Sequence, residues 1–265
     1  MTNLPLQIKT LDQETGKRLA VLIDADNAQP AVIEALLEEV ATFGEAVVRR
    51  IYGDFSLPAS NSWKKLLNKH SIKAMQQFAY TVGKNVTDST MIIDAMDLLY
   101  TRRLDGFCLV TSDSDFTGLA LRLREEGLLV YGFGEQKTPE AFRNACHKFI
   151  FTEILRPASK KRPETVSIAP VDNANLKQPI DSITVLEIPA VFLREALTKS
   201  LDDTGWSQLG TFGSYLQKIQ PDFDTRLYGF KKLSDLVRGY PNLFETQERD
   251  ASGGQHKILY LRAKN

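Results

Sequence analysis

The sequence predicts an α/β protein, with a parallel sheet flanked by helices, followed by a small winged-helix-like domain. The first observation is that short apolar runs alternate with stretches of helical periodicity over residues 19–133. The second is a proline-rich polar segment, and the third is a tail with three helical patterns and two strand-like runs. We expect domains at 18–156 and 186–265, joined by a linker at 157–185.

The elements follow one another in an alternating order. Apolar runs predict strands at 19–23, 46–52, 72–78, 107–110 and 128–133. Helical spacing predicts helices at 29–42, 62–69, 88–100 and 116–126, and Pro30 suits the first turn of the first of these. Such alternation is typical of a parallel sheet. In the tail, the patterns predict helices at 191–200, 207–219 and 230–238 and strands at 243–247 and 257–261.

Composition limits the class of protein and its partners. The chain has 265 residues, 43% of them hydrophobic, and its 33 basic residues balance 33 acidic ones, so nucleic acid would have to be bound by local basic patches. Cys108 and Cys146 lie in apolar contexts without the spacing of metal ligands. No signal peptide or long apolar span is evident, and we expect a cytoplasmic protein with no membrane partner.

Aspartates follow the ends of two predicted strands. Asp24 and Asp26 end one apolar run, Asp113 and Asp115 end another, and Asp88 lies between them in KNVTDSTMIID. The carboxyl ends of parallel strands line a common crevice, so these acids should meet. Two carboxylates about 4 Å apart repel by about 4 kcal/mol at an effective dielectric constant near 20, which favours a bound cation. Oxygen ligands without a histidine or thiolate cluster favour Mg²⁺ or Mn²⁺.

Each acid also has an ordinary structural interpretation. Asp88 and Asp115 suit helix N-caps, and Asp26 suits a turn, which is the role we favour for it. Asp24 and Asp113 are harder to explain in this way, because a carboxylate after a buried strand is costly unless it is paired, hydrogen-bonded or metal-bound. The histidines in this domain, His70 and His147, have no acid beside them in sequence and receive no catalytic role.

Three motifs carry a resemblance to a known family. With IDADN, KNVTDSTMIID and VTSDSDFTGLALRLREEGLLVYGFG, residues 18–155 resemble the NYN domain, a PIN-like nuclease group that includes the LabA-like bacterial proteins. The tail, with FLREALTKS, GTFGSYLQKIQPDF and YGFKKLSDLVRGYPNLFE, resembles the OST-HTH (LOTUS) domain. The resemblance implies a PIN-like sheet, a metal-dependent ribonuclease that we expect to be endonucleolytic, and a tail that binds RNA or protein.

The resemblance also implies roles for individual residues. It assigns catalysis and the binding of one or two Mg²⁺ or Mn²⁺ ions to the family's acid positions, Asp24, Asp88, Asp113 and Asp115. It gives supporting roles beside the ligands or the substrate to Asn27, Asp94, Ser112 and Lys84. The chain departs from the family at Asp26, where relatives often carry glycine or glutamate, and at Ser114, where glycine is common, but neither change removes a ligand.

Basic and aromatic residues near the predicted crevice suit single-stranded RNA, because bases stack on aromatic rings and phosphates meet cations. The candidates are Arg49, Arg50, Lys64, Lys65, Lys69, Lys73 and Lys84, with Trp63 and Tyr80 for stacking. In the tail they are Lys231, Lys232, Arg238, Arg249 and Lys257, with Tyr228, Phe230 and Tyr240, although the spacing of these three rings fits a core equally well.

Two other functions compete with a ribonuclease. A noncatalytic RNA-binding or regulatory adaptor is disfavoured because every matched acid position is still aspartate. A phosphotransferase of the haloacid dehalogenase type is suggested by the DxD at Asp24, but Ala28 stands where that family needs threonine or valine. The sequence leaves open the identity of the RNA, DNA as a substrate, endonucleolytic or exonucleolytic action, and the oligomeric state.

Overall fold

The computed structural model describes residues 16–56, 58–78, 86–156, 186–250 and 257–264. The predicted linker, 157–185, therefore lies outside the described residues. The strands of the N-terminal domain are β1 (Arg18–Asp24), β2 (Glu45–Gly53), β3 (Lys73–Gln76), β4 (Gly106–Val110), β5 (Leu129–Gly134) and β6 (Lys148–Phe151). Its α-helices are α1 (Ile33–Ala41), α2 (Asn61–Lys69), α3 (Val86–Tyr100), α4 (Thr117–Glu125) and α5 (Glu140–Ala145).

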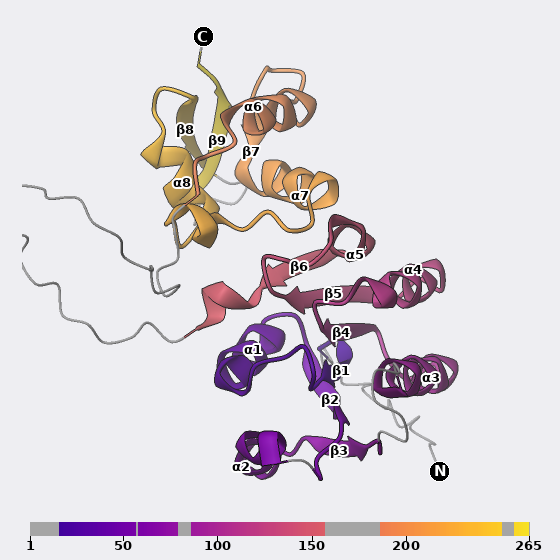
Figure 1. Ribbon diagram of the computed structural model, residues 1–265. Helices are drawn as coiled ribbons and strands as arrows, with labels where there is room; N and C mark the ends of the chain where they lie inside the picture. The colour runs from indigo at the N-terminus through magenta and orange to yellow at the C-terminus, as the bar shows by residue number, and fades with distance from the viewer. Residues whose placement is uncertain (1–15, 57, 79–85, 157–185, 251–256, 265) are drawn as a thin grey trace, which may run out of the picture.

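The six strands form one parallel sheet in the order β3-β2-β1-β4-β5-β6. Helices α1 and α2 lie on one face, and α3, α4 and α5 lie on the other (Figure 1). This architecture confirms the predicted α/β fold. The sequence did not predict α5 and β6, which have only six and four residues and are too short to show a clear period.

Alternating side chains of the central strands fill two cores. In β1, Val21 and Ile23 pack with Leu36 of α1, whereas Leu22 turns to the other face and packs with Met91 of α3. Because both faces are covered, the last six residues of β1 are all buried, which is why the strand reads as a continuous apolar run.

The C-terminal domain is winged-helix-like, as predicted. It contains α6 (Ala190–Lys199), β7 (Ser207–Gln208), α7 (Leu209–Ile219), α8 (Leu233–Gly239), β8 (Phe244–Asp250) and β9 (Lys257–Ala263). The predicted helix at 207–219 begins two residues later than expected, because Ser207 and Gln208 pair with β9. They extend the expected hairpin into an antiparallel sheet of order β7-β9-β8. Among the described residues, no helix is both long and apolar enough to span a membrane.

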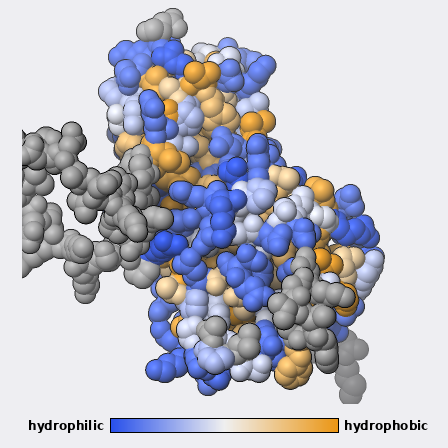
Figure 2. Space-filling model, viewed as in Figure 1, coloured by the Kyte–Doolittle hydropathy of each residue, from blue (hydrophilic) through white to orange (hydrophobic). Residues whose placement is uncertain are grey.

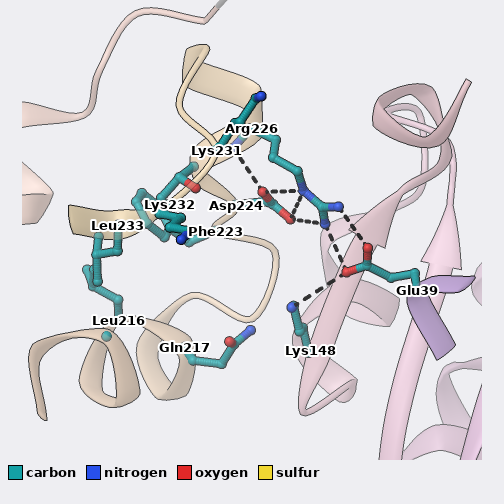
Figure 3. A pocket seen from close by; sticks show the side chains of 12 residues that line it. Glu39, Lys148, Leu216, Gln217, Phe223, Asp224, Arg226, Lys231, Lys232 and Leu233 are labelled. Atoms are coloured by element: carbon teal, nitrogen blue, oxygen red, sulfur yellow. Dashed lines mark hydrogen bonds and ion pairs between the residues drawn. The ribbon is translucent and has the colours of Figure 1, made fainter. Parts of the chain in front are cut away.

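The two domains meet at a seam of polar contacts, and one cluster of buried apolar side chains includes residues of both domains. Arg226 of the C-terminal domain donates to Glu39 of α1 at 2.7 and 3.0 Å and to Asp224 at 2.6 Å, and Lys148 approaches Glu39 from β6 (Figure 3). The amide of Phe149, on edge strand β6, donates to the carbonyl of Pro221 at 2.9 Å. A pocket of about 400 Å³ opens here. These contacts fix the C-terminal domain against the β6 edge of the sheet.

The exposed surfaces of the two domains differ in character. In the view of Figure 2, hydrophilic residues cover most of the visible N-terminal domain, while hydrophobic residues gather on the visible part of the C-terminal domain. Large apolar side chains exposed in the latter include those of Leu186, Val191 and Ile219. None of these three lies at the carboxyl edge of the parallel sheet, where the predicted acids stand.

Candidate active site

The predicted acids follow the two central strands of the sheet. Strand β1 pairs with β2 on one side and with β4 on the other, so the direction of the chain's winding reverses between β1 and β4. A crevice forms at the carboxyl ends of the strands where the order reverses in this way. Asp24 is the last residue of β1, and Asp113 and Asp115 follow β4.

Asp24 is fully buried and held by three donors. Its Oδ1 accepts the amide of Asp26 at 3.0 Å, and its Oδ2 accepts Asn27 Nδ2 at 2.8 Å and Thr111 Oγ1 at 2.8 Å. Burial raises the pKa of Asp24, and the three hydrogen bonds oppose that rise. A carboxylate has about four lone-pair sites, so Oδ1 keeps capacity for a water or a cation.

Residues 111–115 form a short loop that is tied both to β1 and to β5. Thr111 Oγ1 accepts the amide of Asp113 at 3.1 Å, and the carboxylate of Asp113 accepts the amide of Asp115 at 2.9 Å. Ser112 Oγ accepts the amide of Glu135 at 2.9 Å. Gly134 permits this approach, because a Cβ there would lie 2.6 Å from the Thr111 carbonyl oxygen. Ser112 thus orders the loop by binding the segment after β5.

Helix α3 brings a third acid to the loop. Carboxylate oxygens of Asp88, Asp113 and Asp115 lie within 4.8 Å of one another, and we call these three residues the acid trio. Burial, followed by repulsion from Asp24 and the two other members of the trio, raises the pKa of Asp88 to about 6. Asp24 lies outside the trio, but it is the acid whose charge affects Asp88 most.

The acid trio fits a divalent cation of the hard, oxygen-preferring kind. The three side chains offer only carboxylate oxygens. A bound cation would offset the repulsion between these carboxylates, which contributes to the raised pKa of Asp88. The described residues contain no comparable group that includes histidine or cysteine. Both cysteines are buried, away from solvent.

Asp94 has a different set of partners from the acid trio. Its carboxylate accepts Arg50 Nη1 on one oxygen and the hydroxyl of Tyr52 on the other. Burial, followed by its bond to Asp94, raises the pKa of Tyr52. These two contacts of Asp94 join α3 to β2 about 1.7 helical turns beyond Asp88. Sequence reasoning did not find Arg50 or Tyr52 as partners, because nothing in the sequence sets the position of α3 over β2.

Several predicted RNA contacts have other roles. The prediction that Trp63 stacks on bases is wrong, because its side chain is 4% exposed and belongs to the core under α1 and α2. Arg49 donates to the carbonyl of His70 at 3.0 Å, and Lys69 pairs with Glu34 at 2.8 Å. Tyr228 of the tail is also buried. Lys84 and Tyr80 lie outside the described residues.

Comparisons with known proteins agree with the fold and with the motifs. The profile of the NYN domain matches residues 18–155, a little more than half of the chain, and that of the OST-HTH/LOTUS domain matches residues 184–255. A search of curated proteins found no significant match.

Solved structures provide two further similarities. A solution NMR structure of an uncharacterized protein from Nitrosomonas europaea is 48% identical, covers 38% of this chain and 92% of its own, and has a TM-score of 0.29. A crystal structure of a protein of unknown function from Vibrio parahaemolyticus is 19% identical, covers 52% of this chain and 94% of its own, and has a TM-score of 0.44. The two profiles carry the assignment: the chain belongs to the NYN domain family, with a PIN-like fold, and it carries an OST-HTH/LOTUS domain after the NYN domain.

Proposed function

We propose that the protein is a metal-dependent ribonuclease that cleaves single-stranded RNA internally. The observation that carries the proposal is the acid trio, three carboxylates within 4.8 Å of one another at the reversal point of the sheet. Membership of the NYN family, in the PIN-like nuclease superfamily, supports the same reaction class. The OST-HTH/LOTUS domain supports RNA as the substrate.

The chain's own residues would hold and orient the reacting groups. Asp88, Asp113 and Asp115 would bind Mg²⁺ or Mn²⁺, and Asp24 would join them through its remaining Oδ1 capacity, directly or across a water. When bound, such an ion supplies Lewis-acid stabilisation of the phosphate and lowers the pKa of a water. Asn27 and Thr111 keep the Asp24 carboxylate in one orientation, and Ser112 keeps the loop of Asp113 in register with β5.

An RNA cleavage assay tests the proposal. Purified protein is incubated with 5′-labelled and with circular single-stranded RNA in Mg²⁺, Mn²⁺ or EDTA. We expect cleavage of both substrates that EDTA abolishes, because a circle is cut only by an endonuclease. Asp113→Asn should lower the cleavage rate by about 100-fold or more. Asp97 is an exposed acid of α3 outside the trio, so Asp97→Asn should cleave as the wild type does.

The same assay separates the competing functions. Cleavage of linear but not of circular RNA would make the protein an exonuclease. Full activity in a folded Asp113→Asn protein would reject the acid trio as the site. RNA that is bound but intact under every metal condition would favour the noncatalytic adaptor.

A further inference from the structure

The outward face of the C-terminal sheet carries a cluster of rings and guanidinium groups. Strand β9 lies in the centre, and Leu261 and its partner Ser207 are buried toward the helices. Because side chains alternate along a strand, the neighbours Tyr260 and Arg262 point to the opposite face. Trp206, which precedes Ser207, joins them there.

The rings and the cations are in direct contact. The guanidinium carbon of Arg249 lies 5.1 Å from the centre of the Trp206 ring and 4.3 Å from that of Tyr260. The guanidinium carbon of Arg262 lies 4.7 Å from the centre of the Trp206 ring. We call Trp206, Tyr260, Arg249 and Arg262 the wing face. Both rings are partly exposed, and neither belongs to a core cluster of the described residues.

A turn that is fixed by hydrogen bonds leads into Trp206. The Oδ1 of Asp202 accepts the amides of Thr204 at 2.9 Å and Trp206 at 3.1 Å, and the amide of Asp202 donates to the Trp206 carbonyl at 2.7 Å. The backbone of Trp206 is therefore fixed before any partner arrives, and the guanidinium groups of Arg249 and Arg262 contact its ring, which lowers the entropic cost of binding.

The charge of the wing face is only partly neutralised within the chain. Arg262 donates to Glu245 at 2.8 Å, but Arg249 donates only to the neutral Gln247, at 3.2 Å. No carboxylate in the described part of the chain lies within 4.0 Å of the Arg249 guanidinium. The nearest charge effect is on Asp202, whose pKa is lowered by hydrogen bonds from Thr204 and Trp206 and, to a smaller extent, by the charge of Arg249. Gln247 and Gln208 are exposed and flank Tyr260 in register on its two sides.

We propose that the wing face binds single-stranded RNA, with bases stacked on Trp206 and Tyr260 and a phosphate paired with Arg249. Partly exposed rings, a guanidinium with no carboxylate within 4.0 Å and flanking amides match what unpaired bases and their backbone offer. The inference rests on the proposed function, because it names the surface through which the tail recruits the substrate.

Tryptophan fluorescence and anisotropy test the wing face in the full-length protein. The Asp113→Asn variant in EDTA keeps the RNA intact, and an unstructured 12-nucleotide RNA is titrated into it. The chain has two tryptophans, and Trp63 is buried in the other domain, so RNA should quench Trp206 alone. Trp206→Leu should abolish the quenching and weaken binding about tenfold, since stacking on one ring is worth about that much.

A matched pair of arginine variants separates contact from general charge. Arg249→Gln should weaken binding several-fold and reduce its salt dependence, because one phosphate contact is lost. Arg194→Gln removes an equally charged, exposed residue of α6 in the same domain but outside the wing face, and it should bind as the parent does. Circular dichroism checks the fold of each variant, and Trp206→Phe serves if the leucine variant does not fold.

The outcomes of the two proposals are distinguishable. Bound RNA without quenching, together with unchanged affinity in Trp206→Leu and Arg249→Gln, would overturn the wing face even if the protein cleaves RNA. Quenching and weakened variants in a protein that never cleaves RNA would support the wing face and reject the nuclease.

Discussion

At the scale of single residues, the burial of Asp24 makes its hydrogen-bond donors important for stability. Thr111→Val keeps the shape of the side chain but removes the 2.8 Å bond to Asp24 Oδ2 and the acceptor for the Asp113 amide. A buried group that loses its partner costs about 1–3 kcal/mol, so we expect the free energy of unfolding to fall by that amount. Chemical denaturation in EDTA measures it.

A second threonine provides the control for this variant. Thr198 in α6 donates its hydroxyl to the Arg194 carbonyl on an exposed surface, so Thr198→Val should change the free energy of unfolding by no more than about 0.5 kcal/mol. Equal losses in the two variants would contradict the special role of the Asp24 contacts.

The raised pKa of Asp88 predicts how stability depends on pH without metal. The pKa is about 6 in the folded protein, against an ordinary value of 3.8, so the folded state binds this proton more tightly than the unfolded state does. The metal-free protein should therefore lose stability as the pH rises from about 4 to about 6, and the loss should persist above pH 6. Because Asp88 is partly exposed, we expect the effect to be on the order of 1 kcal/mol.

Asp88→Asn tests this directly. In EDTA at pH 7.5 the variant should melt at a higher temperature than the wild type, and the advantage should shrink at pH 5. Added Mn²⁺ should reverse the order, because only the wild type gains stability by binding the ion. The exposed acid of the same helix gives the control: Asp97→Asn should show neither effect.

At the scale of elements, the contact of Asp94 with Arg50 and Tyr52 sets the position of α3, and with it the position of Asp88. Arg50→Met keeps the aliphatic stem but removes the tether to Asp94. Residues that orient metal ligands typically change metal affinity by 10–100-fold, so we expect Mn²⁺ to bind about tenfold more weakly, as measured by titration calorimetry without RNA.

An exposed ion pair elsewhere in the same domain provides the control for the contact between Arg50 and Asp94. Lys69→Met breaks the exposed pair with Glu34 on α1 and should leave Mn²⁺ affinity unchanged. If Arg50→Met bound Mn²⁺ as tightly as the wild type, the Tyr52 hydrogen bond to Asp94 and the apolar contacts of α3 would be enough to position the helix.

Sequence reasoning succeeded where one element determines its own pattern. Buried parallel strands such as β1 and β4 are continuous apolar runs, and their shared carboxyl edge predicted that acids far apart in sequence would meet. It failed where the outcome depends on how elements are placed. The burial of Trp63 and the partners of Asp94 follow from the rotation and translation of α2 and α3 over the sheet, which the helical period does not fix.

At the scale of the whole molecule, the seam and the acid trio lie at different edges of the sheet. Lys148 and Phe149 are at the amino end of β6, whereas the trio stands beyond the carboxyl end of β4. Removing the C-terminal domain would expose the Phe149 amide on an edge strand. Single substitutions at the seam therefore test the role of the tail more cleanly than truncation does.

Arg226→Met is the most informative of these substitutions. It leaves Glu39 and Asp224, whose side chains are 15% and 8% exposed, without their main cation, so we expect the free energy of unfolding to fall by about 1–3 kcal/mol. If Arg226 holds the seam closed, the Phe149 amide should exchange with deuterium faster, because its acceptor, Pro221, belongs to the other domain. Arg122→Met, which breaks an exposed pair with Glu126 at the C-terminal end of α4, should leave that exchange unchanged. Unaltered protection of Phe149 in Arg226→Met would mean that the main-chain bond, the pair of Arg143 with Asp222 and the shared apolar cluster hold the domains together without Arg226.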